Sequence, residues 1–319
     1  MNILVYGGGA VGLGLASCLI KARAFVDVVA REGTVAELNR GGLVRTGIFG
    51  DFHADTSQFG AWVSLDQASG REYDFILVCV KSFDSAAAAA DLAKHGTLFG
   101  EDTRIVLCQN GWGSAETFAS HFDKRRIYNA RVITGFRRPK PNCVEITVHA
   151  DAIHVGSLFG SDPAACQPLC EAIYEGGIPC IVTAAIAKDL WAKMLYNCAL
   201  NPLGAILRVP YGRLARSQYS RSVMDAIVAE VYAVMAAAGH QTHWPRAKDF
   251  LSVFYERLVP DTAAHESSTL QDLVAGKRTE IDALNGEVVR LAKQHNVPVP
   301  VNAAIYRVLK FMEQSRPGA

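Results

Sequence analysis

The sequence has almost no net charge, since 32 basic and 31 acidic residues leave +1 over 319 residues. It therefore lacks a field of one sign that would attract nucleic acid or an anionic membrane. It also lacks an uninterrupted apolar stretch of roughly 20 residues, the length that a membrane-spanning helix needs. The opening apolar run, residues 2–6, is too short for a signal peptide and leads directly into glycines. We expect a cytoplasmic protein without a nucleic-acid or membrane partner.

Metal-binding patterns are missing as well. The eight cysteines are scattered, mostly in apolar runs, as expected of small buried hydrophobes in a reducing compartment. Cys166 and Cys170 have neither a second cysteine pair nor a histidine cluster nearby, so we expect no metal site. No internal repeat or low-complexity segment interrupts the chain. Half of the residues are hydrophobic, which is normal for a globular protein of two domains.

Strands and helices alternate in the first part of the chain. Runs typical of buried strands occur at 2–6, 25–30, 75–80, 104–108 and 126–133, separated in several places by helices such as 85–94. This alternation predicts a Rossmann-type, doubly wound parallel sheet, with further strands from 131–155 at its edge. From residue 185 onward nearly everything has helical periodicity. We therefore expect an α/β domain, residues 1–184, and an all-helical domain, residues 185–319, with frayed final residues 315–319.

A glycine motif directly follows the first strand and opens the first helix. In Gly7-x-Gly9-x-x-Gly12, the first glycine permits a tight turn, the second lets the backbone approach a pyrophosphate, and the third allows close helix–strand packing. The helix N-terminus adds backbone amides and a positive dipole end. The motif predicts a dinucleotide site formed by Gly7, Gly8, Gly9, Ala10, Val11 and Gly12.

The residue that ends the second strand distinguishes the nicotinamide cofactors. An acidic side chain there accepts from the ribose hydroxyl of NAD, whereas an arginine accommodates the 2′-phosphate of NADP. This chain has Arg31 at that position, followed by Glu32. Lys81, just beyond the strand at 75–80, is either a second cation near the cofactor or a solvated lysine at a strand end. We predict that the cofactor is NADPH/NADP+ rather than NAD.

Polar residues interrupt the apolar helical segments of the second domain. Lys193, Asn197 and Asn201 recur at every fourth residue, which places them on one helix face. Ser268 and Glu280 follow further along the chain. Burying a lysine and two amides is costly unless they have partners, so this face either meets polar groups or lines a wet pocket.

This set of side chains suits the reduction of a ketone. The reaction leaves an alkoxide-like oxygen that must be protonated, and a lysine ammonium can do this if an anionic partner keeps it charged. Glu280 is the candidate partner of Lys193, while Asn197, Asn201 and Ser268 are candidate donors to a substrate carboxylate or hydroxyl. Taken singly, each residue is also compatible with a structural hydrogen bond or a surface ion pair.

The chain resembles the ketopantoate reductases (2-dehydropantoate 2-reductases) over essentially its whole length. The resemblance lies in residues 7–12, 80–81, 109–113, 191–202, 268–273 and 278–286. It implies NADPH-dependent reduction of a small-molecule 2-oxo acid, ketopantoate to (R)-pantoate, on the route to pantothenate and coenzyme A. It also implies roles for individual residues: Lys193 as proton donor, Glu280 as its partner, Asn110 near the nicotinamide and the substrate carbonyl, Asn197, Asn201 and Ser268 on the substrate, and Arg31 and Lys81 on the cofactor phosphate side.

The chain departs from the family pattern at two places. Tyr211 precedes Gly212 where family members carry a substrate-contacting asparagine, so we expect Tyr211 to contact the substrate in its place. Residues 136–143 lack a glycine-centred turn. Tyr211 therefore leaves open a paralogous reductase of a bulkier 2-oxo acid, and a catalytically silent NADP(H)-binding regulator is a further alternative. We expect the active site in a cleft between the domains. The amphipathic segment 223–238 is compatible with a homodimer or with core packing.

Overall fold

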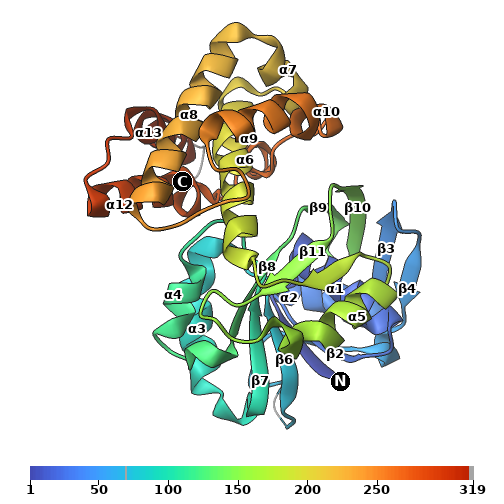
Figure 1. Cartoon of the computed structure of the whole chain (residues 1–319). Helices are drawn as coiled ribbons and strands as arrows, with labels where there is room; N and C mark the ends of the chain where they lie inside the picture. Colours follow the sequence, from blue (N-terminus) through green and yellow to red (C-terminus); the bar gives the residue numbers. More distant parts are fainter. Residues whose placement is uncertain (69, 316–319) are drawn as a thin grey trace. The chain divides into compact units, whose positions relative to one another are not determined.

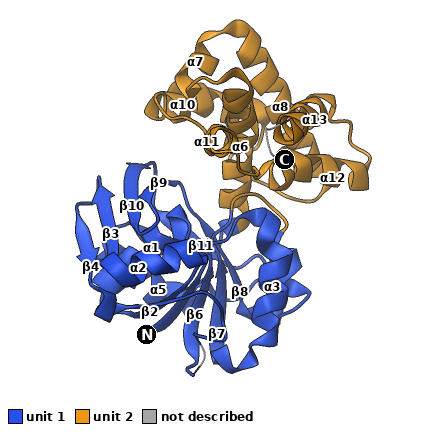
Figure 2. Cartoon of the chain, turned by 180° about the vertical axis from the view of Figure 1, so that it is seen from behind, with its two compact units in different colours: residues 1–109, 114–186 blue, residues 110–113, 187–319 orange. Residues whose placement is uncertain are grey.

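The computed structural model describes residues 1–68 and 70–315, and the chain forms two compact units (Figure 2). Unit 1 consists of residues 1–109 and 114–186, and unit 2 of residues 110–113 and 187–319. The division after residue 186 lies close to the boundary expected at 184. The sequence did not indicate that residues 110–113 belong to the second unit. The expected fraying falls largely on residues 316–319, which lie outside the described residues.

An eight-stranded sheet organises unit 1 in the order β12-β11-β8-β7-β6-β1-β2-β5. Its strands are β1 (Asn2–Tyr6), β2 (Phe25–Val29), β5 (Gly60–Trp62), β6 (Tyr73–Val78), β7 (Phe99–Leu107), β8 (Ile127–Arg131), β11 (Ile153–Gly156) and β12 (Cys180–Val182). Neighbouring strands are parallel except β8 and β11. The chain passes from β1 to β2 on one side, and β6 lies on the other side, so the order reverses at β1. The predicted Rossmann-type sheet is confirmed.

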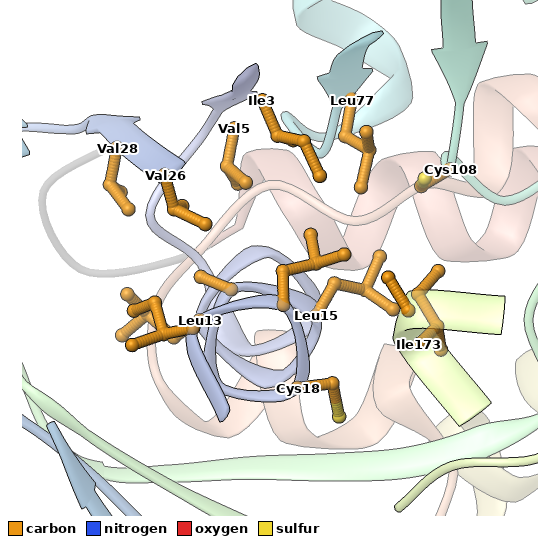
Figure 3. Close-up of a cluster of buried hydrophobic side chains, with 14 of the residues drawn as sticks. Ile3, Val5, Leu13, Leu15, Cys18, Val26, Val28, Leu77, Cys108 and Ile173 are labelled. Carbon is orange, nitrogen blue, oxygen red and sulfur yellow. The ribbon is translucent and has the colours of Figure 1, made fainter. Parts of the chain in front are cut away.

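Helices cover both faces of this sheet (Figure 1). One face carries α1 (Ala10–Lys21), α2 (Glu32–Gly41) and α5 (Gln167–Glu175), and the other carries α3 (Ser85–Lys94) and α4 (Ser114–Ala119). Successive strand residues point to opposite faces. Ile3 and Val5 therefore pack with Leu15 of α1 in the core of Figure 3, whereas Leu4 packs with Leu92 of α3. Burial on both faces explains why the strands are continuously apolar.

A second sheet of four strands corrects one prediction. Its order is β4-β3-β10-β9, with β3 (Leu43–Gly47), β4 (Phe52–Ala54), β9 (Thr134–Lys140) and β10 (Cys143–His149). We expected all strands from 131–155 at the edge of the large sheet, but only β11 joins it. β10 pairs with β3, a strand that the sequence did not reveal. Phe136 of β9 packs against α1 at Gly14, where a Cβ would lie 2.3 Å from its ring.

Unit 2 is helical, as predicted. Its helices are α6 (Ile186–Leu207), α7 (Tyr211–Arg216), α8 (Gln218–Ala237), α9 (Ala247–Val253), α10 (Val259–Asp261), α11 (Ser268–Val274), α12 (Asn285–His295) and α13 (Pro300–Gln314). The apolar side chains of α8, including Ile227, Val231 and Val234, are buried. Core packing thus accounts for this amphipathic segment, and a homodimer stays a prediction. No helix within residues 1–68 and 70–315 is long and apolar enough to cross a membrane.

The long helix α6 continues through Pro202. A proline has no amide hydrogen, so it leaves the carbonyl of Cys198, four residues earlier, without its usual helical donor. The buried Asn285 side chain donates to this carbonyl at 3.2 Å and to Asn302 Oδ1 at 2.9 Å. A side chain from α12 therefore replaces the missing backbone bond in the core, which helps the helix that carries Lys193 to remain continuous.

Candidate active site

The glycines of the turn between β1 and α1 differ in the space around them. Gly7 has φ +119°, and a Cβ there would lie 2.7 Å from the amide nitrogen of Val80. A Cβ on Gly12 would lie 2.0 Å from the carbonyl oxygen of Gly7. At Gly9, however, the nearest atom to a Cβ would be the carbonyl oxygen of Cys79, 4.0 Å away. Gly7 and Gly12 are thus required by the fold, whereas Gly9 leaves open space in front of the backbone.

The N-terminus of α1 faces this space without a side-chain cap. Gly9 is the N-cap residue and makes no side-chain hydrogen bond, and the first turn contains no acidic residue. The first amides of the helix, beginning with Ala10 and Val11, and the positive end of its dipole can therefore interact with an anion. This donor set and the open space at Gly9 fit a dinucleotide pyrophosphate.

Arg31 and Lys81 lie on segments that pack against the glycine turn. Arg31 is exposed at the N-cap of α2 and follows Ala30, whose Cβ would lie 2.5 Å from a Cβ on Gly8. Lys81 is half-buried at the N-cap of the 3-10 turn Ser82–Asp84 and follows Val80, the neighbour of Gly7. The structure thus brings both predicted cations to the region of the turn.

Asn110 links Lys193 to Glu280 within unit 2. The ammonium of Lys193 donates to Asn110 Oδ1 at 2.6 Å, and Asn110 Nδ2 donates to Glu280 Oε2 at 3.0 Å. The amide orientation is fixed by chemistry, because a flipped amide would oppose donor to donor and acceptor to acceptor. The Glu280 side chain is buried, so its interaction with this network is weakly screened. Three residues predicted from the sequence therefore form one hydrogen-bonded chain.

Trp112 anchors the loop of residues 110–113 within unit 2, a role that the sequence did not predict. The Trp112 amide donates to the carbonyl of Ala283 at 3.1 Å. Its ring centroid lies 4.9 Å from that of Trp191 on α6 and 4.8 Å from that of His240. Such aromatic pairs add to the stability from burial. The available signal was a large aromatic residue between two glycines, which is unusual for a solvated loop.

Tyr211 is paired with one of the predicted substrate-binding residues. Its buried hydroxyl donates to Oδ1 of Asn201, which is also buried. Burial raises the pKa of Tyr211 well above its usual value, so the phenol remains a proton-bearing donor. Because Oδ1 of Asn201 accepts from Tyr211, the Nδ2 group of Asn201 can donate to another acceptor.

Asn197 and Ser268 have no such partner in the part of the chain that the structure describes. Asn197 is 8% exposed, and no hydrogen bond engages its amide within residues 1–68 and 70–315. Ser268 is half-buried at the start of α11, where the neighbouring Ser267 caps the helix by accepting from the amide of Leu270 at 3.0 Å. The amide of Asn197 and the hydroxyl of Ser268 are therefore available to water or to a ligand.

Comparison with known proteins gives the family. Residues 3–159 match the family described as ketopantoate reductase PanE/ApbA, and residues 185–313 match its C-terminal domain. The 2-dehydropantoate 2-reductase of Aquifex aeolicus (strain VF5) is 33% identical over 314 residues, which cover 98% of this chain and 97% of that protein. The chain belongs to the ketopantoate reductase family. It is accordingly an oxidoreductase that acts on a CH–OH group.

Solved structures agree with this assignment. A ketopantoate reductase family protein from Ralstonia eutropha JMP134 is 28% identical, with a TM-score of 0.85, and the match covers 98% of this chain and 99% of that one. D-mandelate dehydrogenase, solved with NADH and anilino(oxo)acetate, has a TM-score of 0.87 at 20% identity and 99% coverage of both chains. At that identity the likeness concerns the fold alone. The ketopantoate reductase fold is thus shared by proteins named for different substrates.

Proposed function

We propose that this chain is an NADPH-dependent 2-oxo acid reductase that converts ketopantoate to (R)-pantoate in pantothenate and coenzyme A synthesis. The observation that carries the proposal is the hydrogen-bonded chain from Lys193 through Asn110 to Glu280. Relatives named 2-dehydropantoate 2-reductase support the choice of substrate. Glycine geometry at the β1–α1 turn and the cation Arg31 support the choice of cofactor.

The residues of unit 1 would hold the dinucleotide. The backbone at Gly9 and the first amides of α1 would bind the pyrophosphate, Arg31 the 2′-phosphate, and Lys81 the phosphate or ribose oxygens. When bound, NADPH supplies a hydride to the carbonyl carbon of the substrate. The rest of the reaction concerns a proton and the orientation of the 2-oxo acid, which this chain's own side chains provide.

Lys193 is the proposed proton donor. As hydride adds to the carbonyl carbon, the carbonyl oxygen becomes basic and takes a proton from the Lys193 ammonium. The neutral lysine then regains a proton from solvent. Asn110 Oδ1 fixes one N–H of the ammonium, and in the proposed mechanism another N–H donates to the carbonyl oxygen of the substrate. The buried carboxylate of Glu280, which accepts from Asn110, is the proposed anionic partner of the lysine. A hydrogen bond that strengthens as charge develops on oxygen lowers the barrier.

The 2-oxo acid would be oriented by the remaining polar residues. The free amide of Asn197, Nδ2 of Asn201 and the hydroxyl of Ser268 are neutral donors suited to a carboxylate and a hydroxyl. Tyr211 fixes the Asn201 amide by donating to its oxygen. Tyr211 also motivates the second candidate, a reductase of a different 2-oxo acid, because a buried phenol changes the space beside Asn201.

Steady-state oxidation of NADPH with a panel of 2-oxo acids tests this proposal. We expect the highest kcat/KM for ketopantoate, with lower values for an unbranched and for an aryl-substituted 2-oxo acid. Negligible turnover of ketopantoate together with efficient turnover of a bulkier acid would replace the first candidate by the second. Absence of turnover across the whole panel would reject the reductase proposal.

Tyr211→Phe is expected to raise KM for the 2-oxo acid by roughly 2- to 10-fold, the equivalent of one buried hydrogen bond, with a smaller change in kcat. The reason is that Asn201 loses the donor that fixes its amide. Tyr196→Phe is the matched control, because the Tyr196 ring lies 5.8 Å from that of Tyr211 but its hydroxyl bonds Thr262. Equal KM values in the two variants would show that Tyr211 does not position Asn201.

A further inference from the structure

The antiparallel hairpin of β9 and β10, in the second sheet, lies against the glycine turn between β1 and α1. Phe136 of β9 packs against α1 at Gly14, and Arg138 lies two residues later, where the pairing of β9 with β10 is irregular. One guanidinium nitrogen of Arg138, Nη1, donates to the carbonyl of Gly8 at 2.8 Å and to the hydroxyl of Thr34 on α2 at 3.2 Å. Arg138 is thereby fixed between the dinucleotide turn and the start of α2.

The turn at the end of the hairpin is also anchored. Asn142, which follows β9, donates from Nδ2 to the carbonyl of Gly42 at 2.9 Å, immediately after α2. The hairpin therefore contacts both α1 and the two ends of α2. This anchoring reduces the conformational freedom that Arg138 would lose on binding a ligand.

Arg138 and Arg31 form an uncompensated pair of positive charges. The pKa of Arg138 lies below its usual value because of partial burial and because the positive charge of Arg31 is near. Neither arginine forms an ion pair with a carboxylate within residues 1–68 and 70–315. The neighbouring Arg137, by contrast, donates to Glu145 at 2.8 Å. Like charges that remain together without a counter-charge favour a bound anion.

We propose that Arg138 is a second arginine of the site for the adenosine 2′-phosphate of NADPH, together with Arg31. This inference rests on the NADPH proposal above and assigns part of the nucleotide specificity to the hairpin β9–β10. With Nη1 held by Gly8 and Thr34, Nε and Nη2 remain as donors. A guanidinium is suited to a phosphate, which has several acceptor oxygens and a double negative charge. The corresponding hydroxyl of NADH has neither.

Binding measurements with four ligands test the proposal, and calorimetry gives each dissociation constant without turnover. The ligands are NADPH, NADH, adenosine 2′,5′-bisphosphate and ADP. Arg138→Ala should weaken NADPH and the bisphosphate by about 10- to 100-fold, the equivalent of a charge-assisted hydrogen bond, and leave NADH and ADP within about twofold. Arg31→Ala should show the same selectivity. Arg137→Ala is the matched control, and it should leave all four constants unchanged.

The outcomes separate the two proposals. Equal weakening of NADPH and NADH in Arg138→Ala, at an unchanged melting temperature, would mean that Arg138 only shapes the glycine turn, and it would overturn the inference. Unchanged binding of NADPH would overturn it as well. If the unaltered protein bound NADH as tightly as NADPH and did not distinguish the bisphosphate from ADP, the NADPH proposal itself would fail, whatever the variant did.

Discussion

Replacing Lys193 with alanine is expected to lower kcat by about 10² to 10⁴, the usual contribution of a positioned general acid. The dissociation constant of NADPH should change little, because Lys193 is not among the residues proposed to hold the dinucleotide, Gly7–Gly12, Arg31 and Lys81. The loss arises because the developing oxyanion would have to take its proton from water. Single-turnover and steady-state rates, with NADPH titrated separately, measure both quantities.

Lys188→Ala is the matched control for this experiment. Lys188 lies on the same helix, α6, but is exposed to solvent, so its removal should leave kcat unchanged. An unaltered kcat in Lys193→Ala would remove Lys193 as the proton donor and leave the Asn110 network a structural role. A loss of kcat with equal loss in the Lys188 control would instead point to damage to α6.

The parts of the site that depend on local spacing could be predicted from the sequence. Three glycines between a strand and a helix predicted the glycine turn, and each glycine has a definable steric role. Lys193, Asn197 and Asn201 lie on one face of α6 because the helix repeats nearly every four residues. Strong apolar runs likewise predicted the central strands of the large sheet.

The remaining features depend on contacts between distant segments. β9 and β10 form a second sheet because Phe136 fits against Gly14 and because β3 provides an edge for pairing, and no local pattern encodes either contact. The loop of Asn110 belongs to unit 2 because Trp112 packs against Trp191 and His240. Each of these contacts joins residues far apart in the chain, so periodicity could not reveal it.

Hydrogen bonds by which one side chain satisfies or occupies another polar group could not be predicted from the sequence either. Pro202 within α6 would ordinarily argue for the end of the helix, but the Asn285 side chain satisfies the carbonyl that it frees. Tyr211 was expected to contact the substrate as a replacement for an asparagine. In the structure its hydroxyl is engaged by Asn201, so its proposed effect on the substrate becomes indirect.

Gly9→Ala is expected to weaken NADPH and NADH alike, by roughly 5- to 100-fold, the equivalent of about 1–3 kcal/mol of steric overpacking. The new Cβ would occupy the open space in which the proposed pyrophosphate lies. Protein stability should stay the same or rise slightly, because φ −77° at Gly9 suits alanine and the nearest protein atom to the Cβ is 4.0 Å away. Calorimetric titration and denaturant unfolding measure the two effects.

Gly12→Ala should behave differently, because its Cβ would lie 2.0 Å from the carbonyl oxygen of Gly7 and the backbone must shift. We expect the free energy of unfolding to fall by about 1–3 kcal/mol, with cofactor binding impaired as a consequence. If Gly9→Ala bound both cofactors normally, the pyrophosphate would not approach this backbone. Since both cofactors contain the pyrophosphate, the ratio of their dissociation constants should stay constant in Gly9→Ala. The same ratio should change in Arg138→Ala, so together the two variants separate recognition of the dinucleotide from recognition of its 2′-phosphate.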